Sequence, residues 1–128
     1  MPPHELDYDG DWPDLAGKTL ERLIVQEAWF EGDRDDEANV VWICAGGAWH
    51  KLYFDDGIAC WQTSAAPEAG GADFPLVDLG AKHGVAGEPL AGCHGEAREG
   101  GAAITLAFAR GASVSFHNRY DATTIQVG

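Results

Sequence analysis

Two stretches of the chain share the frame Leu-x-Phe-x-x-Gly within alternating apolar and polar residues. They are KLYFDDGIACW at residues 51–61 and TLAFARGASVSF at residues 105–116. Glycine is the residue that most easily adopts the left-handed conformation that a tight hairpin turn requires. We therefore expect each stretch to form a β-hairpin with a three-residue loop, ending at Gly57 in the first and at Gly111 in the second.

The register implied by these loops gives each hairpin one apolar face. In the first hairpin, Leu52 would face Cys60 and Phe54 would face Ile58. In the second, the predicted pairs are Phe108 with Ala112, Leu106 with Val114 and Ile104 with Phe116. Because a single rule gives an apolar face in two independent segments, the two hairpins support each other.

A second similarity lies upstream of the hairpins. LAGKTLERL at residues 15–23 resembles VAGEPLAGC at residues 85–93, and each precedes its own hairpin. Proline and glycines in the second copy disfavour a helix, so Lys18–Glu31 is also predicted to be a strand. We expect a single domain, residues 1–128, with an acidic arm at 1–14, a first β unit at 15–62, a connector at 63–84 and a second β unit at 85–128.

The remaining segments also favour strands over helices. VVWIC at Val40–Cys44 is typical of a buried strand, and the AGGA that follows should interrupt it. Glu31–Asn39 is predicted to be a solvated acidic loop, Trp29 and Trp42 to lie in the core, and residues 123–127 to form the last strand. The predicted fold is mainly β, with six to eight short strands in a sandwich or half-open barrel.

The charge of the chain is its most unusual bulk property. Eight basic and 21 acidic residues among 128 give a net charge of −13. Such a surface repels nucleic acid and anionic membranes and accelerates encounter with a basic partner. Solubility or adaptation to high salt would explain the same charge, and composition does not separate these explanations.

Cysteine content and hydropathy bear on the compartment. The three cysteines are odd in number and lack paired spacing, which disfavours a disulfide framework. The first residues show neither the basic nor the apolar region of a signal peptide, and no apolar run approaches the ~20 residues of a membrane span. We expect a cytoplasmic protein.

The chain contains no recognisable catalytic motif. The adjacent carboxylates of Asp55 and Asp56 would be solvated at a turn and would lack the perturbed pKa values that acid–base catalysis needs. The serines have no surrounding nucleophile motif, and the histidines and cysteines lack the short paired spacing of structural zinc sites. We therefore expect no catalytic residue, no metal and no cofactor.

In the stretches described above, the sequence resembles the small acidic immunity proteins that bacteria encode beside polymorphic or contact-delivered toxins. The resemblance rests on LAGKTLERLIV leading into WHKLYFDDGIACW, and on ITLAFARGASVSFHNRYDATTI. It implies a stoichiometric inhibitor without chemistry of its own, which blocks the active site of a cognate toxin acting in the cytoplasm. Such a toxin is expected to be basic, because negative charge then mimics its substrate and speeds capture.

Candidate partner-binding residues follow from their predicted positions. The carboxylates are those of the acidic loop and of the first hairpin corner, and the apolar anchors lie on the hairpin face opposite Leu52 and Phe54 or at the ends of the hairpin. The set is Asp33, Asp35, Asp36, Glu37, Trp49, Tyr53, Asp55, Asp56 and Trp61.

Two other functions remain open from the sequence. A small-ligand-binding protein or enzyme would need a deep pocket between the two β units, lined by His50, His117 and tryptophans. A subunit of a larger assembly would pair its exposed strand edges between copies. The sequence does not determine the oligomeric state.

Overall fold

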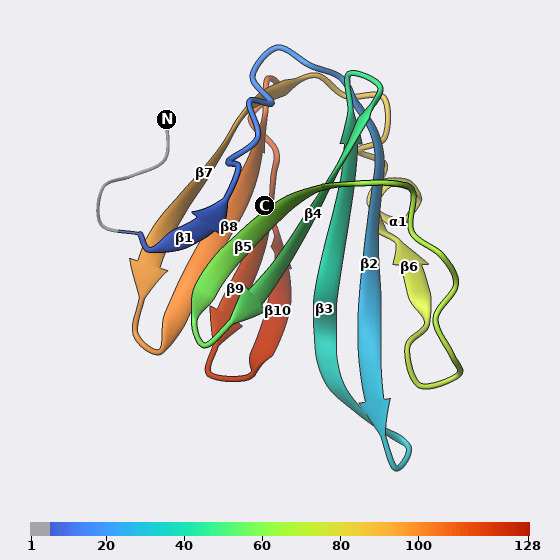
Figure 1. Ribbon diagram of the computed structural model, residues 1–128. Coiled ribbons are helices and arrows are strands. Elements are labelled where there is room, and N and C mark those ends of the chain that lie inside the picture. Colours follow the sequence, from blue (N-terminus) through green and yellow to red (C-terminus); the bar gives the residue numbers. More distant parts are fainter. Residues whose placement is uncertain (1–5) are drawn as a thin grey trace.

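The computed structural model describes residues 6–128, and its regular secondary structure is β-strand except for one short helix (Figure 1). One sheet has six strands in the order β1-β5-β4-β3-β2-β6, and the other has four in the order β10-β9-β8-β7. The sheets form a sandwich-like structure that does not close into a barrel, which confirms the predicted fold class. The elements are β1 (Tyr8–Gly10), β2 (Leu20–Phe30), β3 (Asp33–Ala45), β4 (Ala48–Asp55), β5 (Ile58–Ser64), β6 (Leu76–Asp78), α1 (Leu79–Lys82), β7 (Leu90–Arg98), β8 (Gly101–Phe108), β9 (Ser113–Arg119) and β10 (Ala122–Val127).

Each sheet is built on a four-stranded antiparallel meander, β2 to β5 in one and β7 to β10 in the other. The β2–β3 and β7–β8 hairpins, which open the two meanders, are therefore equivalent. The three-residue strands β1 and β6 extend the first sheet at its two edges. The segments predicted to be an irregular arm and a connector thus contribute β1, β6 and α1, while residues 1–5 of the arm lie outside the described part.

The two meanders meet through the repeated segments, which are related by an approximate twofold axis. The amide of Gly17 donates to the carbonyl of Leu90, and 70 residues later the amide of Gly87 donates to the carbonyl of Leu20. A second pair of hydrogen bonds is related in the same way. The amide of Leu20 donates to the carbonyl of Glu88, and the amide of Leu90 donates to the carbonyl of Lys18. An isolated bridge between Thr19 and Pro89 lies between them. The sequence similarity therefore corresponds to a symmetric joint.

The register of the first hairpin differs from the prediction by one residue. Asp55 pairs with Ile58 across a two-residue turn in which Asp56 and Gly57 both have positive φ, at 52° and 78°. This geometry is that of the type I′ turn which Asp-Gly favours. Leu52 therefore pairs with Trp61, not Cys60, and Phe54 pairs with Ala59.

The second hairpin has the predicted register, with Leu106 opposite Val114 and Ile104 opposite Phe116. Gly111 turns the chain with φ of +98°. However, the two hairpins do not occupy equivalent places, because β4–β5 closes the first meander whereas β8–β9 is the middle hairpin of the second. The longer first unit therefore includes one additional strand, β3, between the matched landmarks.

The core lies between the sheets and is formed by inward-facing residues of both. Its largest fully buried side chains include Trp61, Phe116, Leu23, Ile43, Leu52 and Leu106. Trp42 is buried as predicted, whereas Trp29 is 36% exposed near the end of β2, which contradicts its predicted core position. The predicted last strand is confirmed as β10.

The segment predicted to be an acidic loop is mostly strand. Only Glu31 and Gly32 form a turn, and β3 begins at Asp33 and runs through the acidic residues. The pairing of β2 with β3 shifts register near Ala28 and Asp36, so the hairpin contains a bulge. Charged residues up to Asp35 are tolerated in these strands because the end of the hairpin extends away from the core, which leaves their side chains in solvent, whereas Asp36 is buried.

Candidate functional site

Four β-turns lie at the lower end of the molecule in Figure 1, where those of β4–β5, β7–β8 and β9–β10 lie near one another and that of β2–β3 lies apart from them. They connect β2–β3, β4–β5, β7–β8 and β9–β10, because every second turn of a meander lies at the same end. These turns and their flanking residues carry six carboxylates, Glu31, Asp33, Asp55, Asp56, Glu99 and Asp121. We refer to this surface, with the residues between them, as the acidic end.

The cations at the acidic end already have partners. The guanidinium of Arg34 lies 3.2 Å from carboxylate oxygens of both Glu27 and Glu37. Arg98 pairs with Glu96, and the guanidinium of Arg119 lies 5.6 Å from the centre of the Tyr120 ring. Within residues 6–128, no ion pair engages any of the six turn carboxylates. Their charge is therefore available to a partner.

A shallow depression of about 490 Å³ lies among three of these turns. Asp7, Asp56 and Asp121 contribute carboxylates to its lining, and the side chains of Tyr120 and Ile58 are 64% and 37% exposed. The turns approach closely because they carry glycines. A Cβ placed on Gly57 would lie 3.5 Å from the Cα of Gly101 in the opposite sheet. The depression thus combines apolar surface with negative charge and draws on both meanders.

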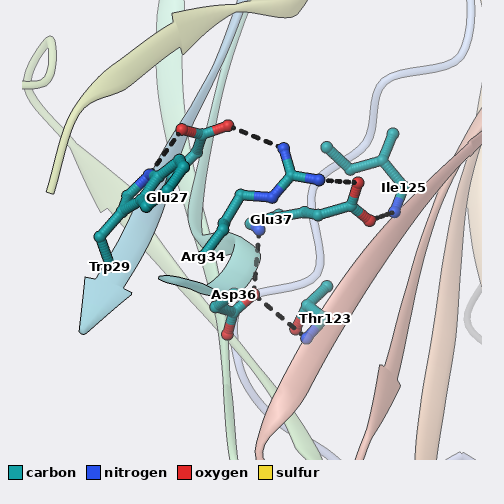
Figure 2. Close-up of polar contacts among 8 residues, drawn as sticks. Glu27, Trp29, Arg34, Asp36, Glu37, Thr123 and Ile125 are labelled. Atoms are coloured by element: carbon teal, nitrogen blue, oxygen red, sulfur yellow. Dashed lines mark hydrogen bonds and ion pairs between the residues drawn. The ribbon is translucent and has the colours of Figure 1, made fainter. Parts of the chain in front are cut away.

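Two of the predicted partner-binding carboxylates are instead used inside the protein (Figure 2). Asp36 is buried, and its Oδ1 accepts the backbone N–H groups of Ala38 at 3.0 Å and Thr123 at 3.1 Å. Glu37 Oε2 accepts the N–H of Ile125 at 3.1 Å. These contacts cap the free edge of β10, so Asp36 and Glu37 join the two sheets, an arrangement that protects an edge strand.

The electrostatics of Asp36 follow from this position. Burial raises the pKa of its carboxyl group above the usual range, although the two backbone N–H groups oppose the shift. Neighbouring Asp35 and Glu37 add a smaller effect in the same direction as burial. The role of Asp36 is therefore structural in this arrangement, and its carboxylate is withdrawn from the surface.

The predicted aromatic anchors do not form one surface. Trp49 and Tyr53 lie half-buried on the outer face of the six-stranded sheet, whereas Trp61 is 2% exposed in the core. Lys51 lies with its Nζ 5.8 Å from the Tyr53 ring centre, and Gln62 donates to the Tyr53 hydroxyl. Trp49 lies six residues along β4 from Asp55, which is about 20 Å in a strand. Of the predicted set, Asp33, Asp55 and Asp56 lie at the acidic end, and Asp35 lies on the adjoining part of β3.

Other residues of the acidic end were not predicted from the sequence. Glu99, Tyr120 and Asp121 lie on the two outer turns of the second meander, which the sequence analysis did not identify. A signal was present, because the dipeptide Glu-Gly occurs at 31–32 and again at 99–100, at equivalent turns of the two meanders.

The histidines of the alternative hypothesis lie on different sheets. His50 on β4 is half-buried, and burial lowers the pKa of its imidazole, with a smaller contribution from nearby Lys18. His117 on β9 lines a shallow depression with Arg98, Glu99 and Thr124, which contains no tryptophan. In the described part of the chain, no group of three or more His, Cys, Asp or Glu side chains is arranged to hold a metal ion.

No protein-family model, curated protein or solved structure shows significant similarity to the chain. Within residues 6–128, no helix has the length and apolar character needed to cross a bilayer.

Proposed function

We propose that this protein is a non-catalytic protein-binding module whose acidic end binds a basic protein. The observation that carries the proposal is the set of six turn carboxylates that form no ion pair within residues 6–128. Two of them, Asp56 and Asp121, line a depression that exposes Tyr120 and Ile58. An apolar centre within a charged rim is the usual anatomy of a protein interface. The net charge of −13 adds long-range attraction to a basic partner.

In its most specific form, the proposal is that the module is an immunity protein. It neutralises a cognate bacterial toxin in the cytoplasm by covering the toxin's active site. A toxin that acts on a polyanion such as nucleic acid presents a basic cleft, and carboxylates displayed on rigid turns can occupy that cleft in place of the substrate. Inhibition of this kind requires occlusion only, so no catalytic group, metal or cofactor is needed.

The test uses the purified product of the adjacent open reading frame as the partner. The double variant Asp56→Asn/Asp121→Asn removes two charges from the acidic end while retaining turn-compatible side chains, because Asn readily adopts positive φ. We expect its association rate constant to fall about tenfold at low salt and the difference to shrink at high salt. The dissociation rate constant should change little.

A matched control removes the same number of charges elsewhere. Asp14 and Glu68 are both exposed and lie outside the four turns. The variant Asp14→Asn/Glu68→Gln should associate within about twofold of the wild-type rate. Equal effects of the two double variants would show that only net charge matters and would refute a role for the acidic end. A neighbouring gene product that is toxic but neither binds nor is neutralised would refute the immunity function.

A further inference from the structure

We propose that the end of the β2–β3 hairpin, together with Phe74, is the apolar anchor of the interface and inserts into an apolar cleft of the basic partner. This inference rests on the proposed function. The surface, here called the hairpin tip, comprises the aromatic residues Trp29, Phe30 and Phe74 and the carboxylates Glu31, Asp33, Asp35 and Asp73. The β2–β3 turn extends furthest at the lower end of the molecule in Figure 1.

The approximate symmetry of the fold supplies an internal comparison for this hairpin. The equivalent β7–β8 hairpin has strands of nine and eight residues, whereas β2 and β3 have 11 and 13. Residues 97–102 at the end of β7–β8 are small or charged, with no aromatic residue among them. A meander of this fold therefore does not require the longer hairpin. The additional residues of β2–β3 include the aromatic residues Trp29 and Phe30.

The aromatic side chains of the hairpin tip are unusually exposed. Phe30 is 68% exposed, Phe74 is 43% exposed and Trp29 is 36% exposed. Residues 29–35 are all exposed, so this part of the hairpin contributes little to the core. Several large apolar side chains exposed on a projecting hairpin and on the loop bonded to it are a feature of contact surfaces, whereas single exposed residues scattered over a protein need no explanation.

Hydrogen bonds and ion pairs hold the hairpin tip in place. The backbone N–H of Trp29 donates to the carbonyl of Asp73 at 2.8 Å, which joins the hairpin to the loop that bears Phe74. The indole N–H of Trp29 donates to Glu27 Oε1 at 3.0 Å, and Arg34 bridges Glu27 and Glu37 (Figure 2). Because its polar group is already bonded, Trp29 offers a partner mainly apolar surface. A preorganised surface also loses less conformational entropy on binding.

The charge around these aromatic residues defines the partner. Four carboxylates flank them in the sequence, and the nearby cation, Arg34, is engaged by Glu27 and Glu37. The complementary surface is an apolar cleft rimmed by Lys or Arg side chains. A second copy of this chain is a poor occupant, because two acidic hairpins would repel each other. Interface aromatics of this kind act mainly on the dissociation rate, which separates them from the turn carboxylates.

The test compares wild-type protein with Phe30→Ser/Phe74→Ser for binding to the purified product of the adjacent open reading frame. Both side chains are exposed, so the variant should keep its circular dichroism spectrum and melting temperature. We expect the dissociation constant to rise by at least about 30-fold, mostly through faster dissociation. Val127→Ser is the control, since Val127 is 49% exposed on β10 and should leave binding within about twofold of wild type.

The possible outcomes separate the two proposals. Wild-type binding that survives in the Phe30→Ser/Phe74→Ser variant would overturn the anchor and leave the proposed function standing. Absence of wild-type binding would overturn both. Light scattering of the protein alone provides a further check, because a dimer that is lost in the double variant would show that the hairpin tip binds a second copy and would overturn the basic partner.

Discussion

Asp36 gives a quantitative test of how β3 is joined to β10. Its Oδ1 is the acceptor for two backbone N–H groups, and the residue is only 7% exposed. Replacement by alanine leaves both donors without this acceptor, and an unsatisfied buried donor costs about 1–3 kcal/mol. Since removal of a buried charge offsets part of the loss, we expect Asp36→Ala to destabilise the fold by about 2–4 kcal/mol. This corresponds to a fall of about 10 °C in melting temperature.

Asp36→Asn distinguishes the effect of the acceptor oxygen of Asp36 from the effect of its negative charge, because the variant keeps the oxygen and removes the charge. The amide can still accept both N–H groups through Oδ1 but is not penalised for burying a negative charge. Because burial raises the folded-state pKa of Asp36, the folded protein binds this proton more tightly than the unfolded chain does. We therefore expect Asp36→Asn to be within about 1 kcal/mol of wild type, or more stable, near pH 7.

The pH dependence has a definite sign. Protonation of Asp36 stabilises the fold, an effect complete below the unfolded pKa of about 3.9 and lost as the pH rises through the raised folded pKa. The free energy of unfolding of wild type minus that of Asp36→Asn should therefore decrease from acidic to neutral pH. Urea denaturation of wild type, Asp36→Asn and Asp36→Ala, at acidic and at neutral pH, measures this difference in free energy of unfolding. The reasoning is refuted if Asp36→Asn is as unstable as Asp36→Ala at neutral pH, or if the difference increases with pH.

Other predictions concern the glycines and the thiols. Gly57→Ala places a side chain at positive φ, with its Cβ in ordinary contact 3.5 Å from the Cα of Gly101, and should cost about 1–2 kcal/mol. In Gly101→Ala the Cβ would lie 2.1 Å from the backbone oxygen of Asn118, so we expect a far larger loss in urea denaturation. Comparable losses would contradict the close approach at Gly101. Burial and the carboxylate of Glu21 raise the pKa of Cys44 to about 11, and burial raises that of Cys93 to about 12. Both thiols should therefore react slowly with a disulfide reagent near pH 8 in the folded protein and readily in urea, and rapid labelling of the folded protein would contradict this.

Local sequence patterns predicted the second hairpin correctly and the first only in part. In β8–β9, buried residues alternate with half-buried ones from Ile104 to Phe108 and from Ser113 to Asn118, so a single register buries the apolar set. In β4–β5, apolar residues occur on both faces, since Cys60 and Trp61 are both buried. The apolar pattern therefore permitted a one-residue slip, and the Asp-Gly turn geometry decided the register.

The acidic segment of β3 shows why the candidate site was harder to predict. Charged residues usually indicate a solvated loop, yet Asp36 is buried against the edge of β10, bonded to an N–H group 87 residues further along the chain. No local pattern reveals such a partner. The position of the acidic turns at one end of the molecule is predictable in principle, because alternate turns of a meander lie at the same end once the number of strands is known. It was not predicted because only one hairpin in each unit was recognised from the sequence.

The joint between the repeated segments has a consequence for concentrated solutions. Each segment bonds to the other through the same set of atoms, so the joint is self-complementary, like the interface of a twofold dimer. The first meander of one molecule can therefore accept the second meander of another without forming any new kind of contact. Exchange of this kind requires the residues between β5 and β7 to extend outside β6, which stays paired with β2, and it would produce an intertwined dimer that preserves both cores.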